Sequence, residues 1–481
     1  MGSRRAFIRT AVAGGAGAFL SDRAVRAAIS PFTSFEDVTG DPWLQVPKIL
    51  SRIKPPLFPR REFEITSFGA IGDGAADCTE AFSKAIAACS NAGGGQVVVP
   101  SGNFLTGPIH LKSRVNLHLG DGATIKFSRD TRRYLPLVFT RWEGVELMNY
   151  SPFIYAFNQE NVAITGTGTI DGQADCEHWW PWKGRTECGW KRGDPNQSKA
   201  RDILIALAEK DAAIRDRVFG EGHFLRPQFI QPYRCKNVLI EGVTLKNSPM
   251  WEINPVLCTN VTVQSVKISS HGPNNDGCNP ESSTDVLIKD CHFDTGDDCI
   301  AIKSGRNADG RRVNVPSSNI VIQGCEMKDG HGGVTIGSEM SGSVRNVFAE
   351  NCRMDSPNLD RALRIKTNSV RGGVVENIHM RNVEVGQVSD AIVSIDFNYE
   401  EGDSGSFPPV VRHIGLRKVR SGKSKYALFL RGYKTAVISD IRLDDCTFDQ
   451  VAQPNVLENV QGLRLSDVRI NGKRIDEKDR I

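Results

Sequence analysis

The sequence predicts an all-β fold, a single-stranded right-handed parallel β-helix with an N-terminal capping helix. Three observations predict it: a short strand pattern that recurs along most of the chain, cysteines that recur at one point of that pattern, and a segment near residue 80 that suits the end of a stack of coils. Of the 481 residues, 46 are Gly and 7% are aromatic. This balance suits many short strands joined by tight turns.

The recurring pattern is Asn or Asp followed by alternating apolar residues. Its copies begin at Asn161, Asn237, Asn260, Asp285, Asn319, Asn346 and Asn377, with degenerate copies at His413 and Asp440. From Asn237, successive copies are separated by 23, 25, 34, 27, 31 and 36 residues. A unit of this length is too small to bury an apolar face alone. Such units must therefore stack, and strand-rich units that stack form a β-helix.

Four cysteines fall at the same point of four units. They are Cys291, Cys325, Cys352 and Cys446. Equivalent positions of stacked units lie above one another, so we interpret them as a column of small buried side chains with free thiols. The alternative, for a chain with 12 cysteines, is a disulfide framework. Cys78 with Cys89 and Cys176 with Cys188 lie outside the column, so these are the pairs we expect if disulfides form.

The capping helix is predicted from the segment that follows Asp77. Asp77 is predicted to be the N-cap of a helix, accepting hydrogen bonds from its first backbone amides, and Phe82, Ile86 and Cys89 then fall on one face. A solenoid needs such a helix to cover its open apolar end. The helix is followed by a glycine-rich turn and the buried-strand run Val97-Val98-Val99. This block resembles the N-terminal coil of the pectin-degrading β-helix enzymes.

The first 27 residues resemble a bacterial twin-arginine export signal. Arg4-Arg5 precede the apolar run Thr10 to Leu20, and Val25-Arg26-Ala27 offers small residues for cleavage. The resemblance implies a periplasmic or secreted mature protein; the alternative is an accidental basic N-terminus with a short core helix. The run is too short to span a membrane, and no other stretch approaches about 20 apolar residues, so we expect no membrane span.

The rest of the chain is predicted to consist of an arm and a β-helix that contains one insertion. Residues 28–60 are predicted to form a proline-rich arm, residues 61–475 the β-helix, and residues 173–228 an insertion that interrupts the repeat. The insertion carries Trp179, Trp180, Trp182 and Trp190. These rings either stack on sugars or pin the insertion to the β-helix. The apolar residues Ile203, Leu207, Ile214 and Val218 mark an amphipathic helix within it.

Four short motifs stand in order along the repeats. They are Asn274-Asn275-Asp276, Gly296-Asp297-Asp298, Gly330-His331-Gly332 and Arg364-Ile365-Lys366. This set resembles the four motifs of the polygalacturonases, glycoside hydrolase family 28, and the resemblance runs from about residue 60 to residue 470. One departure is Asn275, where the better-known fungal members carry threonine; it leaves the acidic residue in place and bears only on the positioning of substrate.

The spacing of the motifs supports one common face. Asp297 lies 12 residues after Asp285, and His331 lies 12 residues after Asn319. They therefore occupy the same position on neighbouring coils, about 4.8 Å apart. Asp276 lies about one coil before Asp297, and the Arg364 motif lies about one coil beyond His331. We expect all four motifs to converge on one face of the solenoid.

The resemblance implies an inverting hydrolase, with Asp297 as general acid and Asp276 and Asp298 activating water. Three close carboxylates repel one another, so at least one should hold a proton near neutral pH, as a general acid requires. Inversion also calls for carboxyl groups about 6.5–9.5 Å apart. His331 is expected to tune the acid through a hydrogen bond. We expect no metal and no cofactor.

The predicted substrate-binding residues are cationic or polar. Arg364 and Lys366 alternate along a strand, so both face one way and can hold the carboxylate of a galacturonate unit. Asn274 and Lys303 complete the expected set. The implied partner is an acidic plant cell-wall polysaccharide, homogalacturonan, or its oligomers. The net charge of +4 is compatible with an acidic substrate but too small to argue for one. No nucleic-acid motif is present.

Several alternatives remain open. A related hydrolase could act on rhamnogalacturonan or xylogalacturonan. A pectate lyase would share the β-helix but would need Ca²⁺ and an arginine base. A non-catalytic carbohydrate-binding solenoid would be expected to lack some of the aspartates. Exo-action is favoured over endo-action, because the insertion could close one end of a groove. The segments Arg141-Trp142-Glu143-Gly144 and Tyr150-Ser151-Pro152 also resemble bacterial exo-acting relatives.

Overall fold

The computed structural model of the chain describes residues 40–475. The expected export signal and residues 28–39 of the expected arm lie outside this range. Residues from Trp43 onward form one compact unit. No helix among the described residues is long and apolar enough to cross a membrane.

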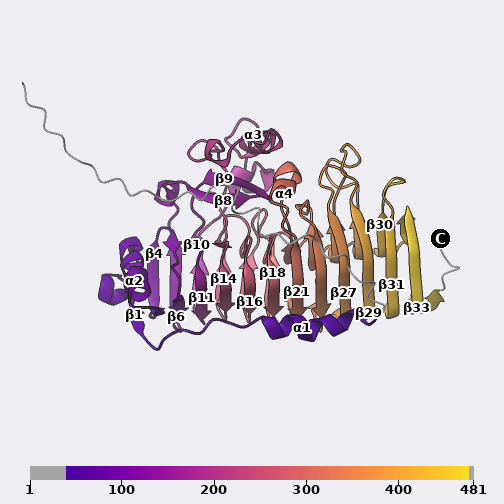
Figure 1. Cartoon of the computed structure of the whole chain (residues 1–481), viewed down its shortest axis with the longest axis horizontal. Coiled ribbons are helices and arrows are strands. Elements are labelled where there is room, and N and C mark those ends of the chain that lie inside the picture. Colours follow the sequence, from indigo (N-terminus) through magenta and orange to yellow (C-terminus); the bar gives the residue numbers. More distant parts are fainter. Residues whose placement is uncertain (1–39, 476–481) are drawn as a thin grey trace, which may run out of the picture. The chain divides into compact units, whose positions relative to one another are not determined.

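The compact unit is a parallel β-helix whose strands stack in register from coil to coil (Figure 1). The first ladder contains β1 (Glu62–Glu64), β3 (Gly95–Val99), β6 (Val115–Leu119), β11 (Glu160–Gly166), β14 (Lys236–Glu241), β16 (Thr259–Gln264), β18 (Thr284–Lys289), β21 (Ser317–Gln323), β24 (Val344–Glu350), β27 (Val374–Val385), β29 (Val410–Ser421), β31 (Ile438–Phe448) and β33 (Val460–Ile470). The short β34 (Lys473–Ile475) turns back antiparallel on β33.

A second ladder runs beside the first and joins it at β27. Its strands are β2 (Asp73–Asp77), β4 (Gly102–Thr106), β7 (Ala123–Phe127), β12 (Thr169–Asp171), β15 (Thr244–Lys246), β17 (Lys267–Ser270), β19 (His292–Thr295), β22 (Glu326–Met327) and β25 (Arg353–Met354). The predicted all-β, right-handed parallel β-helix is confirmed.

The third ladder carries the residues of the four motifs. Its strands are β5 (Ile109–His110), β10 (Ile154–Phe157), β13 (Ile230–Tyr233), β20 (Ile300–Ile302), β23 (Val334–Gly337), β26 (Arg361–Lys366), β28 (Ala391–Asp396), β30 (Tyr426–Arg431) and β32 (Val456–Glu458). Single parallel bridges through Ile253 and Cys278 connect β13 to β20, so the ladder continues between them.

Short helices and one hairpin complete the fold. The helices are α1 (Gln45–Arg52), α2 (Thr79–Asn91), α3 (Ser198–Glu209) and α4 (Asn307–Val313); the hairpin is β8 (Val138–Trp142) with β9 (Val145–Asn149). The 3-10 turns are η2 (Pro42–Leu44), η3 (Ile65–Phe68), η4 (Thr131–Tyr134), η5 (Trp180–Lys183), η6 (Thr186–Cys188) and η7 (Ile214–Asp216).

The recurring Asn has a conformational reason. Asn237, Asn260 and Asn319 have φ of 58°, 58° and 57°, in the left-handed region that Asn tolerates better than other side chains. Their amides also stack: Asn237 Nδ2 donates to Asn161 Oδ1 at 2.8 Å, and Asn260 Nδ2 donates to Asn237 Oδ1 at 2.7 Å. The repeat visible in the sequence is therefore a column of turns that bends each coil at the same place.

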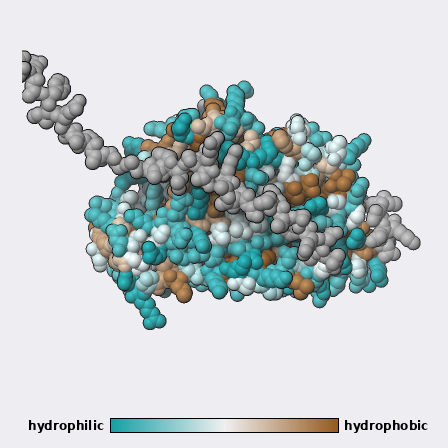
Figure 2. All heavy atoms as spheres, in the orientation of Figure 1, coloured by the Kyte–Doolittle hydropathy of each residue, from teal (hydrophilic) through white to brown (hydrophobic). Residues whose placement is uncertain are grey.

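The interior of the coils is filled by aligned apolar side chains. Val238, Val261 and Val286 are in register on successive strands and are all buried. The described residues on the face shown in Figure 2 are mostly hydrophilic, as expected when apolar side chains fill the interior. The predicted cysteine column is likewise buried and carries free thiols.

Of the two disulfides expected outside the column, one is present and one is not. Cys176 is bonded to Cys188, whereas Cys78 and Cys89 are free and buried. Cys78 directly precedes α2 and Cys89 lies in its last turn. A helix rises 1.5 Å per residue, so the two are separated by about 16 Å, too far for a disulfide. The expected Cys78–Cys89 bond was wrong for that reason.

The capping helix is α2, and it buries the predicted face with Phe82, Ile86 and Cys89. It begins at Thr79, and Asp77 Oδ1 accepts hydrogen bonds from the Thr79 amide at 3.1 Å and its hydroxyl at 2.6 Å. The N-cap position is occupied by Cys78, so the expectation that Asp77 is the N-cap was wrong by one residue, although its carboxylate does accept from the first amide of the helix.

The segment before the β-helix is not simply an extended arm, because it contains α1. Trp43, Val46 and Ile49 form an apolar cluster with Val321 of β21 and Phe348 of β24. This helix therefore packs on the outer surface of the first ladder (Figure 1).

The insertion lies between β12 and β13, and its helix buries a different face from the predicted one. The buried residues of α3 are Ala200, Leu204 and Ala208, whereas Ile203 is 43% exposed. The helix ends at Glu209, so Ile214 and Val218 do not belong to it. The prediction weighted the largest apolar residues, but the close packing at this surface admits small alanines.

Candidate active site

The four motifs converge on the third ladder. Cys278, Ile300 and Val334 are bridged or paired in register on successive coils. Asp276, Asp298 and Gly332 each stand two residues before one of these positions. Asp297 and His331 stand three residues before theirs. The predicted convergence on one face is therefore present: the first three motifs lie in the turn just before the ladder, and Arg364-Ile365-Lys366 lies on β26 of the ladder.

Asp297 and His331 are direct neighbours, as their spacing predicts. His331 Nδ1 lies 3.0 Å from Asp297 Oδ1, and the His331 amide donates to the Asp297 carbonyl at 3.1 Å. Asn274 Nδ2 donates to the other carboxylate oxygen of Asp297 at 3.5 Å. The Asp297 side chain is 13% exposed, against 3% for Asp276 and 0% for Asp298. Asp297 is thus the carboxylate that an incoming ligand reaches first.

Asp298 is held by two cations and a hydroxyl. Lys366 Nζ lies 2.7 Å from Asp298 Oδ2, and Arg364 Nη1 lies 3.1 Å from Asp298 Oδ1. Thr335, which pairs with Arg364 in the ladder, donates to Oδ1 at 3.0 Å. Arg364 and Lys366 face one way, as expected. Their charges are partly neutralised by Asp298, a contact that strand alternation alone did not predict.

Gly332, in the motif next to these residues, makes the packing of Thr335 against Asp298 possible. A Cβ added to Gly332 would lie 2.3 Å from Thr335 Oγ1 and 3.0 Å from Asp298 Oδ1. A larger residue beside His331 would therefore displace the hydroxyl that Asp298 accepts from.

Asp276 lies in a more enclosed position, next to Lys303. Lys303 Nζ is 3.4 Å from Asp276 Oδ2 and 3.1 Å from Glu339 Oε2, and it lies over the Trp251 ring at 4.4 Å from the centroid. Asn279 Nδ2 donates to Asp276 Oδ2 at 3.0 Å. The Lys303 ammonium is therefore shared between two carboxylates inside the protein.

The surroundings divide the protons unequally among the three aspartates. Burial and the adjacent Asp297 carboxylate raise the pKa of Asp276 to about 8, although Lys303 opposes them. Burial alone would raise the pKa of Asp297, but the hydrogen bond and charge of His331 outweigh it and lower that pKa. Lys366 and Arg364 similarly lower the pKa of Asp298 against the effect of burial.

The expectation that one carboxylate holds a proton near neutral pH agrees with Asp276. The hydrogen bond and charge of Asp297 also raise the pKa of His331, which favours the protonated imidazole as a second source of a proton. Asp297 itself is ionised in the ligand-free site. It can act as an acid only after the proton of the His331 hydrogen bond, or another proton of this coupled cluster, moves onto it.

The three carboxylates form one cluster. One oxygen from each of Asp276, Asp297 and Asp298 lies within 4.8 Å of the others. This is a distance between nearest oxygens, whereas the range of about 6.5–9.5 Å for inversion refers to the separation of the carboxyl groups.

Asn275 has a structural role in the turn that presents Asp276. Its Oδ1 accepts from the Gly272 amide at 2.7 Å and the Ser270 hydroxyl at 2.8 Å, and its Nδ2 donates to the carbonyls of Ser248 and Met250 at 3.0 and 2.9 Å. Its side chain is fully buried. This residue shapes the turn and leaves the acidic residue Asp276 in place, as expected of the departure from threonine.

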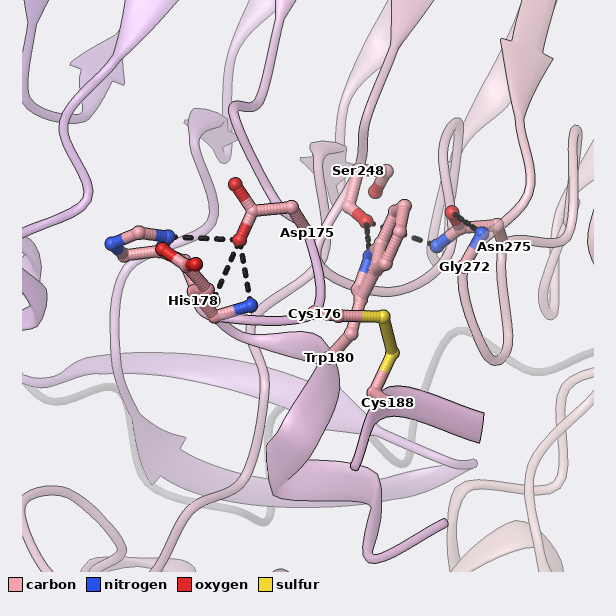
Figure 3. Close-up of a disulfide and its surroundings, with 9 residues drawn as sticks. Asp175, Cys176, His178, Trp180, Cys188, Ser248, Gly272 and Asn275 are labelled. Atoms are coloured by element: carbon pink, nitrogen blue, oxygen red, sulfur yellow. Dashed lines mark hydrogen bonds and ion pairs between the residues drawn. A yellow bond between two sulfur atoms is a disulfide. The ribbon is translucent and has the colours of Figure 1, made fainter. Parts of the chain in front are cut away.

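The insertion lies against that same turn (Figure 3). Trp180 Nε1 donates to the Ser248 carbonyl at 2.8 Å, and a Cβ added to Gly272 would meet the Trp180 ring at 2.2 Å. The Cys176–Cys188 disulfide brackets the 3-10 turn η5 that carries Trp180. The insertion therefore packs against the turn that presents Asp276.

The four tryptophans of the insertion divide between anchoring and surface positions. Trp179 is buried in the main core, and Trp180 and Trp182 pack against it. Trp190 donates only to the Asp194 carbonyl inside the insertion. Trp179 therefore pins the insertion to the β-helix, which is one of the two roles expected for these rings. Trp180 and Trp182 remain partly exposed.

Several site residues were missed by the sequence argument. Tyr399 lies in the loop after β28, with its ring centroid 5.5 Å from Lys366 Nζ and 5.9 Å from Arg364 Cζ. Asp396 pairs with Lys366 on the next coil. Counting one more coil length from the Arg364 motif would therefore have predicted that this loop lies at the site. Arg226 is fully buried and donates to Asn274 Oδ1 at 2.8 Å. Because it lies in the insertion, no repeat spacing could have located it.

The fold and the site together define an enzyme of the glycoside hydrolase class. Residues 221–466 match the family described as glycosyl hydrolases family 28, a little over half of the chain. The chain belongs to glycosyl hydrolases family 28. Residues 63–183 match a second description, Rhamnogalacturonase A/epimerase, pectate lyase-like.

Relatives of known structure or curated sequence agree with this assignment. A hyperthermoactive exopolygalacturonase from Thermotoga maritima is 49% identical, with a TM-score of 0.87, over 89% of this chain and 96% of that one. A probable polygalacturonase of Vitis vinifera is 29% identical over 83% of this chain and 77% of its own length. An exo-poly-alpha-D-galacturonosidase of Dickeya chrysanthemi is 28% identical over 70% of this chain and 57% of its own length.

Proposed function

We propose that this chain hydrolyses the α-1,4 bonds of polygalacturonate and acts from a chain end. The observation that carries the proposal is that three aspartates form one cluster and that the insertion packs against the turn that presents one of them. The relative with 49% identity is an exopolygalacturonase, and the Dickeya relative is an exo-acting galacturonosidase.

Hydrolysis is supported over calcium-assisted elimination by the charges around the aspartates. Asp276 contacts Lys303, and Asp298 contacts both Arg364 and Lys366. A calcium site needs six to eight oxygen ligands with free negative charge. Lys303, Arg364 and Lys366 already neutralise part of the negative charge that a calcium site would need. The lyase alternative is disfavoured for that reason.

In the proposed mechanism Asp297 protonates the leaving oxygen. It is the most exposed of the three aspartates and shares a hydrogen bond with His331, whose proton can move onto it. Asp276 and Asp298 activate the attacking water once Asp276 has passed its own proton to the coupled cluster and is a carboxylate, and the reaction inverts the anomeric configuration. Asn274, Lys303, Arg364 and Lys366 form the substrate-binding set. Nuclear magnetic resonance of the first product, before mutarotation, reports the configuration directly.

Exo-action is supported by the contacts of the insertion. A groove that is open at both ends binds a polymer anywhere along its length, whereas a groove blocked at one end accepts only a terminus. Trp180 contacts the turn at Gly272, and Arg226 reaches Asn274. Both contacts lie next to Asp297 rather than away from it.

Product analysis on polygalacturonic acid tests the proposal. We expect galacturonate or short units from the start of the reaction, no ultraviolet absorbance from unsaturated products, and activity that survives EDTA. Viscosity should fall slowly relative to bond cleavage. A collapse of viscosity after a few per cent of bonds are cut would overturn exo-action, and calcium-dependent growth of absorbance would overturn hydrolysis.

We also propose that the mature chain works in the periplasm or outside the cell. The twin-arginine pattern around Arg4-Arg5 supports export, and the Cys176–Cys188 disulfide suits an oxidising compartment. Fractionation of cells that express the chain with Arg4→Lys and Arg5→Lys tests this. Retention of the unsubstituted chain in the cytoplasm would contradict the location, and export that is unaffected by the double substitution would contradict the twin-arginine route.

A further inference from the structure

The insertion carries two cations, Arg226 and Lys183, that form no ion pair among the described residues, and Arg226 reaches Asn274, which contacts Asp297. Arg226 donates to the side chains of Gln197 and Asn274 and to the carbonyls of Pro249 and Pro273, at 2.6 to 3.2 Å. Within residues 40–475 it forms no ion pair. Lys183, at the end of η5, makes neither an ion pair nor a hydrogen bond with any described residue.

These two cations contrast with the other cations of the site. Lys303 has Asp276 and Glu339 as partners, and Arg364 and Lys366 have Asp298. Buried charge is stable in a protein when it is paired. Lys183 and Arg226 thus differ from these cations in having no ion pair, whereas Arg364 and Lys366 share one carboxylate.

Lys183 is held in place from three directions. The Cys176–Cys188 disulfide brackets its turn, and Trp180 is bonded to Ser248 on the β-helix (Figure 3). The carbonyl of Trp182 accepts from the Gln197 amide at 2.8 Å, and the side chain of Gln197 accepts from Arg226. A lysine on so fixed a turn requires little ordering when it binds an anion.

The electrostatic surroundings show which neighbours Lys183 faces. Burial lowers its pKa, as do the charges of Arg226 and Arg185, while Glu143 and Asp297 oppose the shift. Glu143 is already bound by Arg201 at 2.7 Å and by Arg306 at 3.4 Å. A half-buried lysine between other cations is a site that gains stability when an anion enters.

We propose that Lys183 binds the carboxylate of the terminal uronate at the end of the groove that the insertion closes. This inference rests on the proposed function and deepens it. Arg364 and Lys366 lie on coils beyond Asp298, whereas the insertion contacts Ser248 and Pro249 on the coil before Asn274. The substrate therefore meets one cationic group on each side of Asp297 along the stack. Arg226 acts as a positioning residue that holds Asn274 and supports the positive charge.

Binding measurements test the inference without relying on turnover. In an Asp297→Asn background, titration calorimetry with trigalacturonate should show that Lys183→Met raises Kd about 10- to 100-fold, the range for a lost charged hydrogen bond. Lys183→Arg should restore most of the affinity. Lys191→Met, in the same insertion but exposed, is the matched control and should leave Kd within about twofold.

The three monomethyl esters of trigalacturonate identify the contact. The effect of Lys183→Met should disappear on one of the three esters and persist on the other two. An equal effect on all four ligands, or equal affinity of the Lys183→Met variant and its parent, including no measurable binding by either, would overturn the inference. Product analysis of the unsubstituted enzyme judges the proposed function separately, so the two can fail independently.

Discussion

At the scale of single residues, the site combines paired charges with one buried acid that has no partner. Glu252 is fully buried one coil before Asp276, and neither of its carboxylate oxygens has a hydrogen-bond partner among residues 40–475. Burial raises its pKa to about 8, with the nearby Ser270 hydroxyl opposing and Asp276 adding to the shift. The side chain is therefore accommodated as a neutral acid.

This gives stability a dependence on pH that Glu252→Gln should remove. A free Glu titrates near 4.3, so between about pH 4 and pH 8 the folded state binds more protons than the unfolded state. The free energy of unfolding must then fall as pH rises through this window. Glutamine has no proton to lose. The free energy of unfolding of the variant should therefore rise relative to that of the unsubstituted protein as pH rises, by at most about 1.4 kcal/mol per pH unit.

Urea unfolding at pH 5, 6, 7 and 8 measures this difference. Glu80→Gln, whose side chain is 81% exposed on α2, is the control and should show no growing difference. A Glu252→Gln variant that tracks the unsubstituted protein at every pH would mean that Glu252 is already ionised in the folded state.

Asp297→Asn tests the general acid. The amide keeps the size of the side chain but cannot deliver a proton, so kcat should fall by a factor of about 10² to 10⁴. The thermal midpoint should change little. Asp294→Asn, on β19 of the same coil and bonded to His271 and Lys328, should retain most activity. Retention of more than about a tenth of the activity by Asp297→Asn would show that another residue is the acid.

At the scale of elements, α1 fastens the outer surface of the coils. Arg52 forms an ion pair with Asp285 at 2.6 Å, at the position where Asp replaces Asn in the column of turns. The amide of Lys54 donates to Asn260 Oδ1 at 2.9 Å, one coil earlier. The column of turns therefore serves as a binding surface for the chain's own N-terminal segment.

Trp43→Ala should reveal how much this helix contributes to stability. Trp43 is 7% exposed, and its ring lies 5.4 Å from Phe348 and 4.0 Å from the Arg381 guanidinium. Replacing a buried Trp by Ala costs about 3–5 kcal/mol in the free energy of unfolding. The neighbouring Leu44 is 65% exposed, so Leu44→Ala should cost no more than about 0.5 kcal/mol. Equal, small losses for the two variants in urea unfolding would mean that α1 is not coupled to the coils.

The elements differ in how far the sequence could predict them. The ladders follow from Asn turns and alternating apolar residues, both of which are local and repeated. The helix α1 was missed because the surface it covers, at Val321 and Phe348, is more than 250 residues away in sequence. The face of α3 was misassigned because Ala200 and Ala208 are buried only by close packing against a neighbouring surface. Partners set by distant packing leave no local pattern.

The same division applies to the site. Equal spacing from Asp285 and Asn319 predicted that Asp297 and His331 are neighbours. The contact of Lys366 with Asp298 depends on how far each side chain extends between coils. The spacing of a repeat predicts the coil on which a residue lies, but not which side chains on neighbouring coils touch. The cations of the insertion lie outside the repeat altogether.

At the scale of the whole molecule, two apolar cores have different structural roles. The interior of the coils sets the register of the motifs. A second apolar cluster joins β9, α3 and the end of the insertion through Leu147, Leu204 and Leu225. Asp309 of α4 accepts from the Glu146 amide at 2.8 Å and from Arg217 at 2.6 Å, which connects the hairpin, the insertion and α4 (Figure 1). This second core supports the insertion where it meets the active site.

Trp180→Ala should therefore change how the enzyme attacks a polymer more than whether it cleaves. The ring fills the space above Gly272 and bonds to Ser248, and its loss opens the closed end while Trp179 still anchors the insertion in the main core. A longer chain can then pass through the groove, so solution viscosity should fall faster for the same number of bonds cut. Trp190→Ala removes a ring bonded only within the insertion and should leave the ratio of viscosity loss to bond cleavage unchanged. If Trp180→Ala keeps the ratio of the unsubstituted enzyme, the end of the groove is closed by some other part of the insertion.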